Sequence, residues 1–92
     1  MKYDLIVLTE AENGGSKTIS TIEIENEIGF EKRQKYLFEN FNTIMNYTNV
    51  ENLYKKQLTI LGNAEIEIVS ICYHGGGHYT AHHFLVTFVE CE

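Results

Sequence analysis

The chain has 92 residues, of which 43% are hydrophobic, and a formal net charge of −6 at pH 7. A chain of this length forms one domain and buries about 60–65% of its unfolded surface, which is enough for a single core. The negative charge argues against general nucleic-acid binding, which needs lysine and arginine to neutralise phosphates. We also expect no membrane span, because no run of about 18 apolar residues occurs.

The cysteines and the N-terminal residues indicate the cellular compartment in which the protein is expected. Cys72 and Cys91 have no spacing typical of a disulfide framework, which favours a reducing cytosol. Residues 1–4 lead directly into an apolar run and lack the signal-peptide pattern. Frequent Asn, Ile, Lys, Tyr and Glu, with no Pro or Trp, are compatible with an AT-rich bacterial or phage genome. We therefore expect a cytoplasmic protein, located in the host cytosol if a phage encodes it.

The first third of the chain predicts a β-hairpin. The continuous apolar run 5–8 indicates a central strand buried on both faces, within 2–9. Residues 13–16 are a turn signal, and 17–25 read as a second, more exposed strand.

Glutamates concentrate in this hairpin and just after it. Such a surface is usually a solvated face, but it also suits the basic groove of a nucleic-acid-handling enzyme. An acidic protein–protein inhibitor is therefore one expected function. Its partner-binding residues would be Glu10, Glu12, Glu23, Glu25 and Glu27.

Two helices are predicted in the middle of the chain. Apolar residues at Phe30, Leu37, Phe41 and Ile44 fall on one stripe of a helix over 30–47. Thr48-Asn49-Val50-Glu51 matches a capping box, which predicts a second helix over 49–61, ended by Gly62-Asn63. A short strand from Gln57 is the alternative, because 59–61 have strand propensity.

The last third predicts a long hairpin. Segments 64–73 and 79–90 are rich in β-branched and aromatic residues, and glycines 75–77 separate them. If His74 faces His78, the even-numbered face is apolar and would meet the stripe of the first helix. In that register Ile68 opposes Phe84, Ile66 opposes Val86 and Ala64 opposes Phe88.

The expected fold is one α+β domain over 1–92 with the order β-β-α-α-β-β. Its four-stranded, mainly antiparallel sheet would carry both helices on one face. A ferredoxin-like or dodecin-like arrangement is the alternative if 57–61 form a strand. The opposite sheet face is apolar in part and is a candidate homodimer surface, with Val69, Ile71, Leu85 and Val89.

The glycine-rich tip of the long hairpin is the leading candidate site. Glycine backbone N–H groups can hold an anion, protonated histidines strengthen that binding, and tyrosines can stack on a base. We therefore expect a small non-enzymatic binding or inhibitory module for an anionic small molecule such as a nucleotide. A phage or mobile element could use it against a host system. The candidate ligand-binding residues are Tyr73, His74, Gly75, Gly76, Gly77, His78, Tyr79 and His83.

Metal binding and catalysis are two further interpretations of the tip, beside a simple glycine turn. Cys72, His74 and His78 could converge on zinc, although no cofactor is expected otherwise. Residues 76–81, Gly-Gly-His-Tyr-Thr-Ala, resemble the histidine box of the ubiquitin-specific proteases. That resemblance implies a general base at His78. It covers six residues, and the cysteine box of the family is missing, so binding is the favoured expectation.

Overall fold

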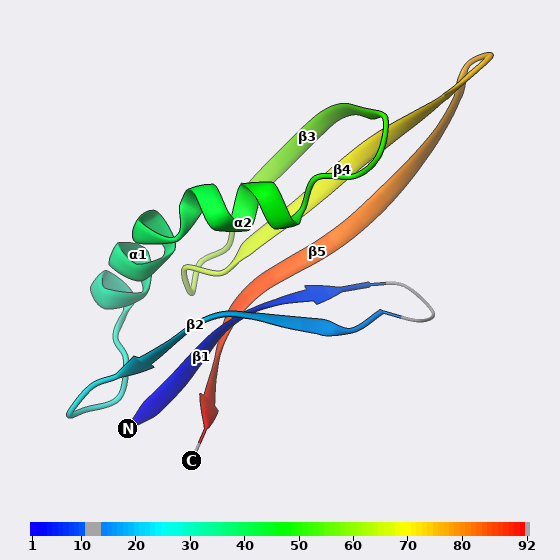
Figure 1. Ribbon diagram of the computed structural model, residues 1–92. Helices are drawn as coiled ribbons and strands as arrows, with labels where there is room; N and C mark the ends of the chain where they lie inside the picture. Colours follow the sequence, from blue (N-terminus) through cyan, green and yellow to red (C-terminus); the bar gives the residue numbers. More distant parts are fainter. Residues whose placement is uncertain (11–13, 92) are drawn as a thin grey trace.

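The computed structural model describes residues 1–10 and 14–91 and shows an α+β fold (Figure 1). Its single sheet has five antiparallel strands in the order β2-β1-β5-β4-β3. The predicted four-stranded sheet is therefore wrong by one strand, and the order along the chain is β-β-α-α-β-β-β. The elements are β1 (Lys2–Thr9), β2 (Ser16–Glu23), α1 (Phe30–Glu39), α2 (Phe41–Tyr47), β3 (Leu53–Ile60), β4 (Ile66–Gly75) and β5 (His78–Cys91).

Strand β1 lies between β2 and β5, as its apolar run predicts. Leu5 and Val7 are fully buried on the face that the helices cover. Ile6 and Leu8 are half-buried on the opposite face. Alternation of side chains along a strand places these two pairs on opposite faces, so the apolar run contributes to both.

Strand β5 joins the two halves of the sheet. Its C-terminal part pairs with β1 from Phe84 to Cys91, whereas residues 78–83 pair with β4 alone. The β4–β5 hairpin therefore extends beyond β1, as the yellow and orange ribbon shows (Figure 1). The longest dimension of the molecule is 53 Å.

The predicted register of this hairpin is confirmed over most of its length. Ile66 pairs with Val86, and Ile68 pairs with Phe84. The predicted pairing of Ala64 is wrong, because Ala64 precedes β4 with a positive φ of 61°. Its expected partner Phe88 instead pairs with Leu5 of β1.

The predicted pairing of His74 with His78 is also wrong. The register shifts by one residue between Tyr73 and Gly75, so Gly75 opposes His78. All three glycines, 75–77, have positive φ, with values of 88°, 60° and 80°. Glycine adopts this conformation without the steric cost that a Cβ adds, and the tight turn depends on it.

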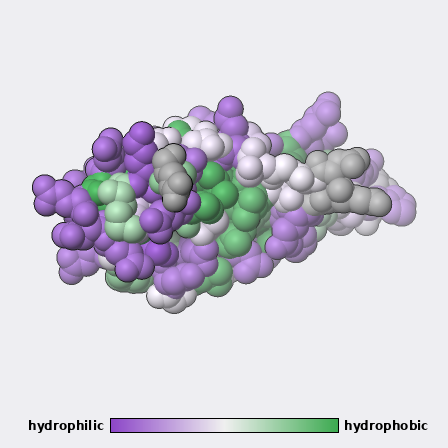
Figure 2. Space-filling model, turned by 90° about the horizontal axis from the view of Figure 1, so that it is seen from below, coloured by the Kyte–Doolittle hydropathy of each residue, from purple (hydrophilic) through white to green (hydrophobic). Residues whose placement is uncertain are grey.

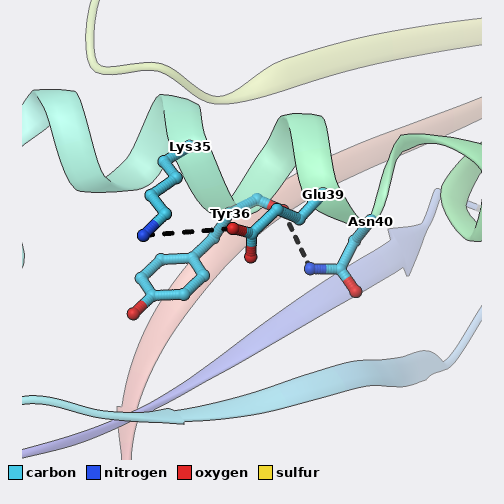
Figure 3. Close-up of polar contacts among 4 residues, drawn as sticks. All are labelled: Lys35, Tyr36, Glu39 and Asn40. Carbon is cyan, nitrogen blue, oxygen red and sulfur yellow. Dashed lines mark hydrogen bonds and ion pairs between the residues drawn. The ribbon is translucent and has the colours of Figure 1, made fainter.

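The predicted helix over 30–47 is two short helices that meet at Asn40. The Asn40 side-chain amide donates to the Tyr36 carbonyl at 2.8 Å (Figure 3). The backbone N–H of Asn40 donates to the same oxygen at 3.1 Å. This double capping ends α1, and α2 begins at the next residue. Lys35 and Glu39 form an exposed ion pair at 4.0 Å, which contributes little to stability.

The predicted second helix over 49–61 is wrong, because Leu53–Ile60 form β3 along β4. Thr48 does not begin a helix: its hydroxyl donates back to the Ile44 carbonyl at 2.9 Å and ends α2. Asn52, with φ of 57°, then turns the chain into the strand. The alternative of a strand from Gln57 is correct in type, but the strand begins four residues earlier.

Lys56 ties β3 to the end of α2. Its amine donates to the Met45 carbonyl at 2.7 Å, the Thr48 hydroxyl at 3.0 Å and the Asn49 amide oxygen at 2.7 Å. Burial lowers the pKa of Lys56, and these three acceptors offset part of the cost of desolvating its charge.

Replacing Lys56 with methionine should lower the free energy of unfolding by about 1–3 kcal/mol, because three acceptors lose a charged donor. Chemical denaturation measures this change. Lys17→Met is the control, since Lys17 is an exposed lysine on β2 and should cost little. Equal losses in the two variants would show that the Lys56 contacts do not stabilise the fold.

The core lies between the helices and one face of the sheet. Leu37 of α1 and Ile44 of α2 belong to the same buried cluster as Phe84, Val86 and Phe88, which confirms the predicted packing. Phe41, which the sequence places on the same stripe, is 38% exposed and lies outside that cluster. No helix in the described part of the chain is long and apolar enough to cross a membrane.

Candidate functional site

Three tyrosines from three strands form an exposed aromatic cluster near the outer end of the sheet. The ring centroids lie 5.0 Å apart for Tyr73 and Tyr79, 5.2 Å for Tyr54 and Tyr79, and 6.4 Å for Tyr54 and Tyr73. Each ring is between 41% and 60% exposed. We call Tyr54, Tyr73 and Tyr79 the tyrosine platform. Rings at these separations contact one another, so a ligand would stack on the platform and not enter between the rings.

The local pairing explains how these rings meet. Tyr73 and Tyr79 are direct partners across β4 and β5, as the sequence predicts, so their side chains share one face. Strand β3 has an irregularity between Leu53, which pairs with Cys72, and Lys55, which pairs with Ile71. Tyr54 lies at this irregularity and completes the cluster. The platform is on the sheet face opposite to the helices.

The glycine tip begins directly beyond the platform. Gly75 pairs with His78, which is next to Tyr79 in sequence. The His78 side chain is exposed and near Gly76, where an added Cβ would lie 3.6 Å from the imidazole Cδ2. Alternation along β5 directs the His78 side chain away from the face of Tyr79, so His78 lies at the end of the sheet and not on the platform itself.

The other two candidate histidines, His74 and His83, lie away from the place where the platform and the glycine tip meet. A ring nitrogen of His74, Nε2, is 2.7 Å from the Thr80 hydroxyl, and Nδ1 is 4.0 Å from the Cys72 thiol. His74 thus belongs to the face that carries the helices. His83 pairs with Val69 on the platform face, four residues along β5 from Tyr79. At about 3.3 Å per residue it is roughly 13 Å from Tyr79.

The candidate metal ligands are only partly brought together. Cys72 is buried beside His74, whereas His78 lies at the tip on the far side of the register shift. Within residues 1–10 and 14–91, no three His, Cys, Asp or Glu side chains form a group that could hold a metal ion.

The candidate partner-binding glutamates that the structure describes lie at opposite ends of the β1–β2 hairpin and do not form one patch. Glu23 ends β2, and Glu25 and Glu27 follow it in the connection to α1, all three exposed. Glu10 follows β1 at the opposite end, where its N–H donates to the His83 carbonyl at 3.0 Å. Glu12 lies outside the described residues.

The open face of the sheet carries the apolar residues that the sequence suggests for a homodimer. Val69, Ile71 and Leu85 are half-buried there, and Val89 is exposed. Hydrophobic side chains gather near the middle of the molecule when it is seen from below, with hydrophilic side chains around them (Figure 2).

Sequence reasoning missed Tyr54 because it placed this residue in a helix. The signal was present in 53–60, Leu-Tyr-Lys-Lys-Gln-Leu-Thr-Ile, whose Thr59 and Ile60 favour a strand. Extending that strand toward the N-terminus would have brought Tyr54 beside the hairpin.

The fold and the tyrosine platform define a small α+β domain with an exposed aromatic surface. In comparisons with known proteins, no family model, curated protein or solved structure matches this chain.

Proposed function

We propose that this protein is a non-enzymatic binding module that stacks a planar, anionic ligand such as a nucleotide on the tyrosine platform. The observation that carries the proposal is the clustering of three exposed tyrosine rings beside the glycine tip. We also propose a cytoplasmic role as an inhibitor of a host system, and this part rests on composition alone.

Stacking suits the chemistry of the platform. Two of its rings come from paired positions on adjacent strands, and the third comes from the irregularity in β3, so backbone pairing on both sides of β4 holds the cluster together. A base stacked on an aromatic side chain is worth about 1–3 kcal/mol, and every base has a ring face that can stack. Tyrosine also offers a hydroxyl at the rim of the stack.

The phosphate would lie toward the tip. His78 is exposed at the end of the sheet, where its imidazole N–H can donate to a phosphate that extends past the last strand residues, and glycines 76 and 77 let the backbone approach closely. The net charge of −6 disfavours the binding of long nucleic acids, because their affinity depends on many contacts between phosphates and lysine or arginine. A mononucleotide needs only one such contact, so we propose a small ligand.

Replacing Tyr73 and Tyr79 together with alanine should weaken the binding of nucleotides and of nucleosides by at least about tenfold, through loss of stacking. His78→Ala should weaken nucleotides while leaving nucleosides unchanged, because it removes only the phosphate contact. Isothermal titration calorimetry over a panel of nucleotides and nucleosides measures both effects.

Two controls separate stacking from folding. Tyr73→Phe with Tyr79→Phe keeps both rings and should retain most of the affinity. Tyr47→Ala removes an exposed tyrosine from α2, far from the hairpin in sequence, and should change nothing. Full affinity in the double alanine variant, or no binding to any member of the panel by the unmodified protein, would contradict the proposal.

A further inference from the structure

Strand β3 is an edge that is open to pairing with another strand. It has eight residues and pairs with β4 on one side, and it is the last strand in the sheet order. Edge strands are commonly protected by lysines. Here, however, three hydrogen bonds hold the Lys56 amine against the end of α2. Its charge therefore does not project from the edge, where it would disfavour pairing with another strand. The edge therefore keeps unpaired backbone groups along its length.

Apolar side chains are unusually exposed along this edge. Ile60 is 71% exposed, and Leu53 and Leu58 are each 40% exposed. All three lie on the helix face, since they pair with Ile66, Cys72 and Ile68. The other edge strand, β2, exposes mainly serine, threonine, lysine and glutamate.

An apolar groove of about 450 Å³ continues this surface onto the helices. Ile60 lies in its wall together with Phe38 of α1, which is 86% exposed, and Leu37. A monomer rarely leaves a contiguous apolar surface of this kind uncovered, so a partner is expected at this edge.

We propose that β3 pairs with β3 of a second copy of this chain, antiparallel and with Gln57 facing Gln57 across a two-fold axis. The axis is perpendicular to the sheet, so each face of one copy continues into the same face of the other. In this register Ile60 lies opposite the irregularity at 53–54 of the second copy, where Leu53 is on the same face, and Leu58 faces Lys56 next to the axis. The same pairing thus covers the exposed apolar residues of both edges.

Charges select this register among the possible ones. On the open face, Lys55 would oppose Thr59 of the second copy, whose own neighbour on β4 is Glu67. Lys55 and that Glu67 would be about 10 Å apart at their backbones, two strand spacings, which two long side chains can bridge. Symmetry creates the contact twice. Shifting the register so that Lys56 faces Lys56 would instead place Lys55 over Gln57 and Val69, with no carboxylate.

A designed crosslink tests the dimer and its register together. In a Cys91→Ser background, Gln57→Cys should oxidise rapidly to a disulfide-linked dimer, because paired positions in antiparallel strands lie within the Cα separation that a disulfide needs. Thr59→Cys alone should not crosslink, since Thr59 faces Lys55, whereas Thr59→Cys mixed with Lys55→Cys should. Native mass spectrometry of the unmodified protein should show twice the 10.6 kDa of one chain.

Two surface variants identify the interface. Ile60→Asp should convert the dimer to a monomer that remains folded, because this side chain is already exposed in one copy. Val89→Lys alters the open sheet face, beside Asp4, and should leave the dimer intact. A monomeric unmodified protein would overturn the proposal. So would a dimer that Val89→Lys dissociates, or one that Gln57→Cys fails to crosslink.

Discussion

Replacing Ile44 with alanine should lower the free energy of unfolding by about 2–5 kcal/mol, the range seen for deleting a fully buried aliphatic side chain. Of the seven residues of α2, all of which the structure describes, Ile44 alone is buried in the core cluster, and the half-buried Met45 packs against that cluster. A helix of this length has almost no stability by itself in water, so its position depends on these contacts.

Thermal unfolding measures the effect, and the midpoint should fall by roughly 10–30 °C for a domain of this size. Thr43→Ala, an exposed change on the same helix, should shift the midpoint by no more than a few degrees. Equal shifts for the two variants would show that α2 is not held through Ile44.

Replacing Ser70 with alanine is the second large change expected in stability. The Ser70 hydroxyl donates to the carbonyl of Thr48 at 2.5 Å, and both residues are fully buried. This bond connects the end of α2 to β4. Without the hydroxyl, the buried Thr48 carbonyl loses this hydrogen bond, which costs about 1–3 kcal/mol.

Urea denaturation of Ser70→Ala beside Ser16→Ala isolates this effect, because Ser16 is an exposed serine on β2. Hydrogen exchange should also rise in α2 more than in β1, since the lost bond anchors the helix. Wild-type stability and unchanged exchange in Ser70→Ala would contradict the role assigned to this bond.

The strands were largely predictable because their patterns are local. The apolar run of 5–8 indicates a central strand, and β1 is central in the sheet, although Ile6 and Leu8 are only half-buried on the open face. Alternation in 66–72 and 80–86 determines which face is buried, and the observed pairs of Ile66 and Ile68 follow from it. A slip by one residue would move every apolar side chain to the wrong face.

The second helix was not predictable in this way, because 49–61 satisfies two patterns. Val50, Leu53, Leu58 and Leu61 fit a helix, while the β-branched Thr59 and Ile60 favour a strand. Pairing with β4 decides between them, and it is a long-range contact that periodicity within the segment does not contain. Sheet edges are where tertiary context most easily overrides local preference.

The candidate site was predicted in part. The sequence places Tyr73 and Tyr79 together, since both flank the glycine turn in a register that the core determines. It could not place His74, because the register shift at the tip depends on the conformation of three consecutive glycines. It also missed Tyr54, which reaches the platform through an irregularity in a strand that was predicted as helix.

Chemical-shift mapping by two-dimensional ¹⁵N–¹H NMR, during titration of the unmodified protein with a nucleotide, tests the stacking site most directly. We expect saturable shifts confined to Tyr54, Tyr73, Tyr79 and the backbone of 75–78. A nucleoside should shift the tyrosine amides and leave the tip unchanged. Shifts centred on any other surface, or none at saturating ligand, would contradict ligand binding at the tyrosine platform.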